Sequence, residues 1–288
     1  MNKPGKKFYT GVAVLVVICL LAAAASASGL VFSARAKARL AAEKALNDKY
    51  GITYDMLSYF ISEFYENGDG TGTMSYEGLE DMAFVLGRYD VRVKDDTVLD
   101  VTWSHDGEDT SKGFESAAWG TEQLKEMVEI NRETWSMEGF TPYIDKINAE
   151  NGFVLEEQPM PEVDDETFMN AKRQARDQSH YSAEELDRMI LEAAAMQYQL
   201  TPEQAGMMTY DEVEDPLMSY GMEDDGTPCY WRTLFLVQDP DPENPYDFHD
   251  NPTEKDGTYY VIINVRTGVI EDVEYDTGVG GNGWSLRG

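Results

Sequence analysis

Hydrophobic and polar residues alternate near the end of each half of the chain, and this pattern predicts two β-hairpins. In the first half, the strand 87–93 is followed by the polar stretch KDDT and then by the strand 98–103. In the second half, the strand 257–265 is joined to the strand 269–275 by a turn at Arg266-Thr267-Gly268. Because alternate side chains of a strand point to opposite faces, each hairpin has one apolar face that a helix has to cover.

Helical patterns precede both hairpins. The alanine-rich stretch 33–48 favours helix, and the stretch 182–200 places apolar residues on one face behind a capping box of Ser182 and Glu185. A short turn follows each of these helices, capped by Thr53 in the first half and begun at Thr201 in the second. The pattern also predicts helices at 121–135, 141–152 and 166–176, strands at 56–65 and 229–237, and a turn at 66–72.

The end of the first alanine-rich helix is repeated at the end of the second. Residues 50–53, YGIT, match residues 198–201, YQLT, and the two hairpins align as well. The aligned pairs are Gly87/Gly257, Tyr89/Tyr259, Val91/Val261, Val93/Ile263, Val98/Val269, Leu99/Ile270, Asp100/Asp272, Val101/Val273 and Trp103/Tyr275. Short alternating strands resemble one another by chance, but the shared helix end weighs against chance. The expected fold is α+β, with an N-terminal transmembrane helix followed by two small helix-plus-antiparallel-sheet repeats.

Three stretches carry a resemblance to a known family. AEKALNDKYGIT, GRYDVRVKDDTVLDVTW and GTYYVIINVRTGVIEDVEY resemble the PepSY-type domains of exported bacterial proteins, and they cover about half of the chain after the apolar segment. The second hairpin matches best, with Thr267-Gly268 at its turn. The first departs from the pattern, because it has Asp96-Thr97 at the turn and an insertion at 68–86. The resemblance implies a non-catalytic extracytoplasmic module that restrains a partner, and it brings no active-site residues.

The predicted division of the chain follows from this repeat. Residues 1–33 form a membrane anchor or signal segment, and residues 34–153 form a first PepSY-like domain with C-terminal helices. Residues 154–164 form a linker, because the stretch VLEEQPMPEVDD holds two prolines and five acidic residues. Residues 165–288 form a second PepSY-like domain.

The N-terminal segment has the features of a membrane span. Residues 8–34 carry no charge and follow three lysines, and a helix of about 20 such residues crosses the hydrocarbon core. Ala25-Ser26-Ala27 is an acceptable cleavage site, but the apolar residues 30–32 continue the run and favour an uncleaved anchor that continues as helix into the first domain. The basic head, apolar middle and small-residue end predict a cytoplasmic N-terminus and a body outside the cell membrane, secreted if the segment is cleaved.

The charge of the body limits its partners. All 54 acidic residues but only 17 of the 23 basic ones follow Arg39, which gives this part a net charge of −37. Such a surface repels nucleic acid and anionic lipid, and it is more typical of solubility in an ion-rich exterior than of cation binding. Cys229 is the only cysteine outside the apolar segment, so no disulfide can form within the body. An exported protein without disulfides fits a bacterial cell surface.

Two acidic loops have features of a calcium site. NGDGTGTMSYEG begins at Asn67 and has the spacing of a calcium loop, but Gly78 stands at the twelfth position where a bidentate carboxylate closes the ion shell. A glycine-rich hairpin turn is therefore the better interpretation. The loop 239–250 holds five acidic residues that could collect a weak divalent ion, although solvated loop acids are the more common case.

Other reactive residues give weaker signals. His105, His180 and His249 lack helical ligand spacing and an obvious third ligand, and Cys229 lies in a strand beside aromatic residues, which favours a buried thiol. Glycine clusters at 68–72 and 278–283 lack the lysine of a phosphate loop. Tryptophans that could stack on sugars, but that are more often core residues, stand at Trp135, Trp231 and Trp284.

These observations predict a non-catalytic protein-binding module with no catalytic, cofactor or metal site. The expected partner is an envelope protein, either a peptidase or a signalling regulator, and the oligomeric state is open. Two alternatives remain: a cell-surface hydrolase or metal-dependent enzyme, which would gather His105 or His249 with carboxylates in a pocket, and a module that binds wall carbohydrate.

Overall fold

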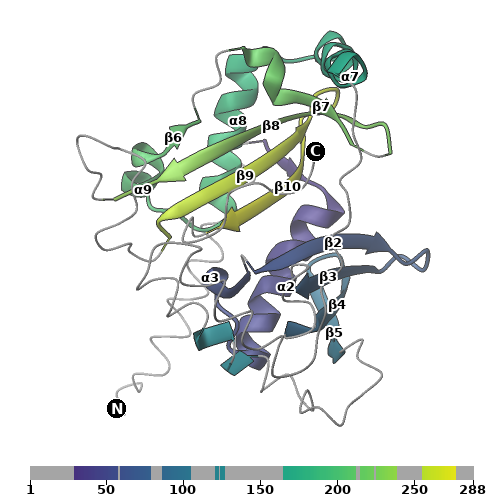
Figure 1. The fold of residues 1–288 in the computed structure, drawn as a ribbon, viewed down its shortest axis with the longest axis vertical. Coiled ribbons are helices and arrows are strands. Elements are labelled where there is room, and N and C mark those ends of the chain that lie inside the picture. The colour runs from purple at the N-terminus through teal and green to yellow at the C-terminus, as the bar shows by residue number, and fades with distance from the viewer. Residues whose placement is uncertain are drawn as a thin grey trace, which may run out of the picture.

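The computed structural model describes residues 29–57, 59–78, 86–104, 121–122, 124–126, 165–211, 215–223, 225–238 and 255–276. These residues form an α+β fold of two sheets with a few helices, as predicted (Figure 1). The helices are α2 (Ala34–Tyr50), α3 (Tyr54–Leu57), α7 (Asp165–Asp177), α8 (Ala183–Gln197), α9 (Pro202–Met207) and the 3-10 helix η2 (Pro216–Ser219). The strands are β1 (Val31–Phe32), β2 (Phe60–Glu66), β3 (Gly72–Gly78), β4 (Arg88–Lys94), β5 (Thr97–Ser104), β6 (Thr209–Tyr210), β7 (Tyr220–Met222), β8 (Pro228–Leu236), β9 (Gly257–Asn264) and β10 (Val269–Asp276).

The first half forms a four-stranded antiparallel sheet in the order β2-β3-β4-β5. The hairpin predicted in this half is confirmed as β4 and β5, and the turn predicted at 66–72 lies between β2 and β3. The strand predicted at 56–65 begins too early, because the carbonyl of Thr53 accepts hydrogen bonds from Met56 and Leu57 and winds this part into α3. Helix α2 covers one face of the sheet through Ala38, Ala42 and Leu46.

The second half forms a larger sheet in the order β1-β10-β9-β8-β6, with β7 also paired to β8. The predicted hairpin is confirmed as β9 and β10, and the predicted strand at 229–237 is β8. The predicted helices are α7 and α8, and Ser182 and Glu185 form the expected capping box. Helix α8 packs on β8, β9 and β10 with Leu186, Ile190 and Ala193 fully buried.

The two halves share part of their order of elements. Each has a long helix, α2 or α8, then a short helical turn and antiparallel strands that end in a hairpin. The second half adds α7 before α8 and η2 before β7, and its β6 and β7 both pair with β8. The long helices also end alike. Gly51 after α2 has φ 72°, and Gln199 at the equivalent place after α8 has φ 54°. Both are left-handed, so the YGIT and YQLT stretches turn the chain in the same way.

A tyrosine pair connects each helix end to its hairpin. The rings of Tyr50 and Tyr89 have centroids 5.2 Å apart, and those of Tyr198 and Tyr259 have centroids 5.3 Å apart. Tyr89 and Tyr259 occupy aligned positions in the two hairpins. Tilted and edge-to-face aromatic pairs at this spacing are favourable beyond the area they bury. The tyrosines of the repeated stretch therefore fix the helix on the sheet in both halves.

The last strand of each hairpin contains the same irregularity. A bulge lies just before Asp100 in β5 and just before Asp272 in β10, and each aspartate accepts a hydrogen bond from the backbone N–H of the next residue. Val93 pairs with Val98, and Ile263 pairs with Ile270. On the N-terminal side of the bulge, the alignment of the two hairpins made from the sequence is therefore displaced by one residue from the alignment of their registers. Val98 corresponds to Ile270 and the bulged Leu99 to Glu271. The alignment from Asp100 and Asp272 onward agrees with the two registers.

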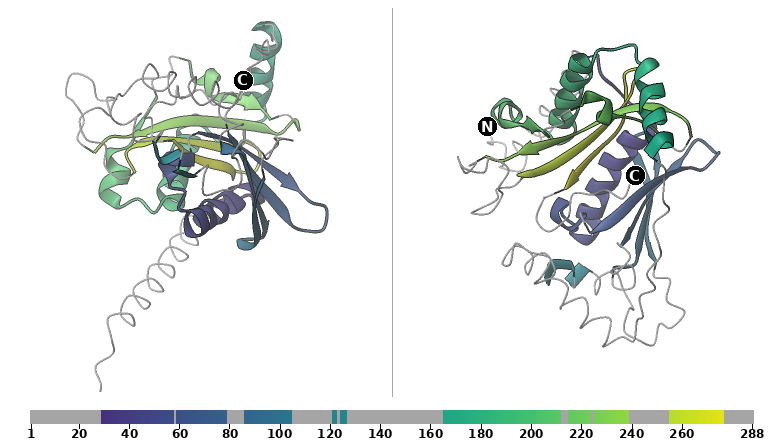
Figure 2. Two further views of the ribbon diagram at one scale, coloured as in Figure 1. Left: turned by 60° about the horizontal axis from the view of Figure 1, so that its bottom comes forward. Right: turned by 45° about the horizontal axis from the view of Figure 1, so that its top comes forward.

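The first helix contacts both sheets. Figure 2 shows α2 between the two sheets, and it packs on β3, β4 and β5 as well as on β10. Strand β1 precedes it and pairs in parallel with β10, Val31 opposite Val269. The boundaries predicted for the two domains stay a prediction, because most of residues 105–164, including the helix predicted at 141–152 and the linker, lie outside the described ranges. Of the helix predicted at 121–135, only residues 121–122 and 124–126 are described, and they are helical.

The prediction of one helix running from the apolar segment into the body is wrong. Gly29 has φ 70°, residues 31 and 32 form β1, and the Ser33 side chain caps α2 by accepting a hydrogen bond from Ala36. No helix in the described part of the chain is long and apolar enough to cross a membrane. The predicted span itself lies mostly in residues 1–28, outside this part.

The helix ends give a test of backbone strain with a built-in comparison. Gly51→Ala places a side chain at a left-handed position where no neighbouring atom lies within 4 Å, so only the backbone is strained. We expect the free energy of unfolding to fall by about 1 kcal/mol. Gln199→Gly relieves the same strain and should leave stability unchanged or slightly raised. Denaturant unfolding of the full-length protein measures both, and a loss of equal size in the two variants would contradict this view of the helix ends.

Candidate functional site

The calcium-like loop after β2 is a self-contained hairpin turn. The carboxylate of Asp69 accepts hydrogen bonds from the backbone and hydroxyl of Thr71 and pairs with Arg92 at 2.6 Å. The hydrogen bonds from Thr71, with the charge of Arg92, lower the pKa of Asp69. Asn67 donates to the hydroxyls of Thr71 and Thr73. The oxygens that would bind an ion are therefore used inside the turn, as the glycine-rich hairpin interpretation predicts.

The histidines and the remaining acidic residues that the sequence singles out are not gathered into a metal site within the described part of the chain. His180 is exposed beside the end of α7. His105, His249, the acidic loop 239–250, Trp135, Trp284 and the glycine cluster 278–283 lie outside the described residues. Within the described ranges, no group of three or more His, Cys, Asp or Glu residues is placed to hold a metal ion.

Cys229 and Trp231 both lie in β8, but Cys229 is buried whereas Trp231 is 37% exposed. Cys229 is buried, and this burial raises the pKa of its thiol to about 12. Trp231 lies beside the buried ammonium of Lys172, which is 5.7 Å from its ring centroid and 4.4 Å from that of Phe168. Lys172 also donates to the carbonyls of Met218 and Tyr220, at 2.7 and 3.1 Å. These contacts fix α7 on η2 and β7.

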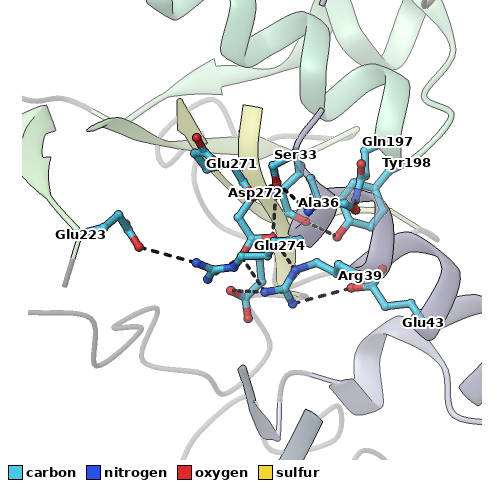
Figure 3. Close-up of polar contacts among 12 residues, drawn as sticks. Ser33, Ala36, Arg39, Glu43, Gln197, Tyr198, Glu223, Glu271, Asp272 and Glu274 are labelled. Carbon is cyan, nitrogen blue, oxygen red and sulfur yellow. Dashed lines mark hydrogen bonds and ion pairs between the residues drawn. The ribbon is translucent and has the colours of Figure 1, made fainter. Parts of the chain in front are cut away.

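The most strongly perturbed charged groups lie where α2 meets β10. Arg39 on α2 binds the carboxylate of Asp272 on β10 with two hydrogen bonds, from Nε at 2.7 Å and from Nη2 at 2.8 Å (Figure 3). Both residues are 1% exposed. The bonds are bidentate, which is the strongest geometry for an arginine and a carboxylate. We call this contact, with the residues that surround it, the α2–β10 junction.

Further charges surround this pair. Arg35, one turn earlier on α2, approaches Asp272 at 2.7 Å and Glu223 at 3.6 Å. Arg39 lies 3.6 Å from Glu274 and 3.9 Å from Glu43. Of these, Arg35, Glu223 and Glu274 are partly exposed, whereas Glu43 is buried with Arg39. Two arginines therefore face four carboxyl groups.

The charges in the junction shift one another's pKa values in opposite directions. Burial alone would raise the pKa of Asp272, but Arg39 and Arg35 outweigh it and lower the pKa. Burial opposes the charge on Arg39 too, but Asp272 and Glu274 raise its pKa well above the usual value. Glu43 has only the longer contact to Arg39, so burial dominates and raises its pKa to about 8. The Arg39–Asp272 pair stays ionised, whereas Glu43 is mainly protonated at neutral pH.

Uncharged contacts join the same two parts of the chain. Gln197 at the end of α8 donates to the carbonyl of Ala36, and the Ser33 hydroxyl donates to the carbonyl of Glu271 (Figure 3). The ring of Tyr54 from α3 meets Tyr198 and Tyr275 of the second half at 5.5 and 5.7 Å. The junction is therefore a closed contact of backbone, aromatic and ionic groups.

Three polar atoms inside this region have no hydrogen-bond partner among the described residues. They are Nε of Arg35, Oε2 of Glu43 and the hydroxyl of Tyr76, which is 1% exposed. The pKa of Tyr76 is raised by burial and by the charge of Glu43, which shows that the two groups act on one another. A buried acid without full hydrogen bonding favours its neutral form. The raised pKa of Glu43 therefore follows from its surroundings within the chain and does not require a bound substrate.

Sequence reasoning missed the junction, although it left a signal in each element. Arg39 lies one turn from Arg35 and one turn from Glu43, in a helix that is otherwise rich in alanine. Asp272 lies in an alternating strand next to Val273 and is aligned with the exposed Asp100 of the first hairpin. A row of charged residues along an alanine-rich helix is equally typical of a solvated face, so it does not identify a buried partner.

A scan against protein-family models, a search of curated proteins and a search of solved structures found no match to this chain. The PepSY resemblance therefore stays a prediction that rests on the quoted stretches.

The Arg39–Asp272 pair gives a prediction with a matched control. Asp272→Asn leaves Arg39 buried without its counter-charge, and we expect the free energy of unfolding to fall by about 3 to 5 kcal/mol. Asp100→Asn changes the equivalent bulge residue, which is exposed and lies opposite Arg92, an exposed arginine that pairs with Asp69, and should cost less than about 0.5 kcal/mol. Thermal and denaturant unfolding compare the two variants. Equal losses would mean that the bulge, and not the ion pair, is what stabilises the structure.

The hydroxyl of Tyr76 gives a second comparison. Tyr76→Phe removes a buried hydroxyl without a described partner, and we expect stability to be unchanged or raised by about 1 kcal/mol. Tyr275→Phe removes a buried hydroxyl that donates to the carbonyl of Asp256 at 2.7 Å, and should cost about 1 kcal/mol or more. Unfolding measurements on both variants test the difference, and a substantial loss in Tyr76→Phe would show that its hydroxyl has a partner.

Proposed function

We propose that this protein is a membrane-anchored, extracytoplasmic and non-catalytic module that binds another protein of the bacterial envelope. The observation that carries the proposal is the use of its charged groups. Arg39 and Glu43, whose pKa values are raised strongly, are enclosed with Asp272 in the α2–β10 junction, where they connect the two halves. A perturbed acid or base in a reaction centre has to reach a substrate, whereas these groups are buried.

The repeated features support an origin as two diverged copies of one PepSY-like unit. Part of the order of elements, the left-handed helix ends, the tyrosine pairs and the bulged aspartates recur in both halves. Independent strands and helices share alternation easily, but they have no reason to share a bulge and a helix end at matching places.

The proposed anchor comprises residues 8–28. Leu30 and Phe32 pack against the core of the second sheet, so the apolar residues 30–32 belong to the folded body and not to the proposed span. The 21 residues that remain are uncharged, and about 20 are sufficient to cross a bilayer as a helix.

The proposed binding surface is the face of the first sheet opposite α2, and we define it by Ile61, Glu63 and Tyr65 of β2 with Asp90 of β4 and Asp100 of β5. In the register of the sheet, Glu63 lies in one row with Asp90, and Tyr65 lies in one row with Asp100. Ile61 and Tyr65 are 40% and 44% exposed, although both are large hydrophobic residues.

The excess of acidic residues on this surface favours a basic partner. Arg88 and Arg92 lie on the same face, but each is already paired with an acid, Asp90 at 2.9 Å and Asp69 at 2.6 Å. The acidic residues of the face, Glu63, Glu77, Asp90 and Asp100, outnumber its basic ones, Arg88, Arg92 and Lys94, and the residues after Arg39 carry a net charge of −37. A partner that brings lysines and arginines around an apolar contact would complement it. A peptidase or a signalling regulator of the envelope fits this description if its docking face is basic.

Site-specific crosslinking in intact cells tests the proposal. A photo-crosslinking residue at Ile61 or Tyr65 should yield a defined product with one protein, which mass spectrometry identifies. The same residue at Met207 on α9, which is equally exposed, should not yield that product. Changing Glu63 and Asp90 to lysine should weaken the product at least tenfold, because the complementary charges then repel.

Two outcomes would contradict the proposal. One is a product that forms equally from position 207, which indicates non-specific contact. The other is a product that is insensitive to the charge reversal and to added salt, since exposed charge pairs are screened within about 10 Å at 0.1 M salt.

A further inference from the structure

Glu43 lies inside the α2–β10 junction in a position that favours a neutral carboxyl group. It is 4% exposed, its Oε1 is 3.9 Å from Arg39, and its Oε2 has no hydrogen-bond partner among the described residues. A charged carboxylate in such a place would lack both water and a close counter-ion. The geometry alone therefore separates Glu43 from Asp272, which receives two close hydrogen bonds from Arg39.

The elements around Glu43 supply few compensating charges. Its own helix contributes Arg39, with Arg35 one turn earlier, and β10 contributes the acids Asp272 and Glu274. Tyrosine hydroxyls face it from β3 and from the end of α8, namely Tyr76 and Tyr198. The residues of β4 and β5 that are buried in the core beneath α2 are uncharged; they are Tyr89, Val91, Val93 and Val101.

The balance of charge depends on the proton of Glu43. Arg39 already forms ion pairs with Asp272 at 2.7 Å and with Glu274 at 3.6 Å. An ionised Glu43 would place a third anion around one guanidinium in a region that excludes water. Repulsion between Glu43 and the two acids of β10 would then act across the contact between the helix and the strand.

We propose that the proton of Glu43 keeps α2 seated on β10, and that its loss loosens the α2–β10 junction while each half keeps its own sheet. The device is a pH-sensitive contact between the two halves. It goes beyond the binding function proposed above and does not depend on it, because it concerns only groups within the chain.

The direction of the effect follows from proton binding. The ordinary pKa of a glutamate is 4.5, and burial raises that of Glu43 to about 8. Between these values the folded junction holds a proton that an opened junction releases, so its stability falls as pH rises through this range. Asp272 has a lowered pKa and stays ionised throughout the range, so it does not reverse the trend.

Hydrogen exchange of the full-length protein in detergent tests the proposal. Exchange is measured at pH 6 and pH 9, corrected for the intrinsic effect of pH, in peptides covering β1 with the first turns of α2 and in peptides covering β10. We expect protection at pH 9 to fall at least tenfold in the peptides covering β1 and the first turns of α2, where the backbone N–H of Ser33 donates to the carbonyl of Ile270, whereas β10 should keep the protection of its pairing with β9. A peptide from the middle of α8 should change much less and serves as the internal reference.

Glu43→Gln provides the decisive variant. Glutamine has the shape of the protonated acid and cannot ionise, so the variant should keep the protection of the junction at pH 9. Glu166→Gln on α7 is the control, because Glu166 is exposed, and it should lose protection like the wild type. The wild-type profile is a test in itself if the variant fails to fold. Equal protection of the wild-type junction at both pH values, or the same loss in Glu43→Gln, would overturn the proposal.

Discussion

The buried ion pair between Arg39 and Asp272 is the contact on which the arrangement of this protein depends. It joins residues 233 positions apart and connects the first helix of one half to the last strand of the other. Neither side chain can keep its position alone, because a buried charge without its partner loses hydration and gains nothing in return. The pair therefore makes the two sheets one structure, and β1, Gln197 and Tyr54 add neutral contacts around it.

The same pair shows how two similar halves came to differ. Asp100 and Asp272 occupy the same bulge and bond to the next backbone N–H in the same way. Asp100 is exposed, whereas Asp272 is covered by α2. Since a bulge aims a side chain away from the regular alternation, it offers a ready acceptor on the strand. The arginine of α2 uses this acceptor in one half only, so an element that both halves share becomes a connection between them.

The sequence predicts what is local and leaves open what is distant. Hairpins, helices and the capping box at Ser182 follow from periodicity and from neighbouring residues, and they are confirmed where the structure describes them, except that the first helix begins at Ala34 and does not continue from the apolar segment. The partner of Arg39 could not be predicted, because charge pairing over 233 residues leaves no periodic signal. Residues 30–32 were ambiguous for a related reason: an apolar run is equally suited to a membrane and to a sheet edge, and only the pairing with β10 decides between them.

The overall acidity of the chain makes the two arginines at the α2–β10 junction important for holding the two halves together. The residues after Arg39 carry a net charge of −37 and repel one another, and this repulsion opposes any compact arrangement of the two halves. Placing two arginines at the contact puts positive charge where acids from both halves converge, so the contact is attractive although the surfaces around it repel. Glu43 is the acid for which this attraction is insufficient, and it avoids the repulsion by keeping its proton. With Glu43 protonated, two arginines face three ionised carboxylates, so the contact between the helix and the second sheet is close to neutral although the chain around it is strongly acidic.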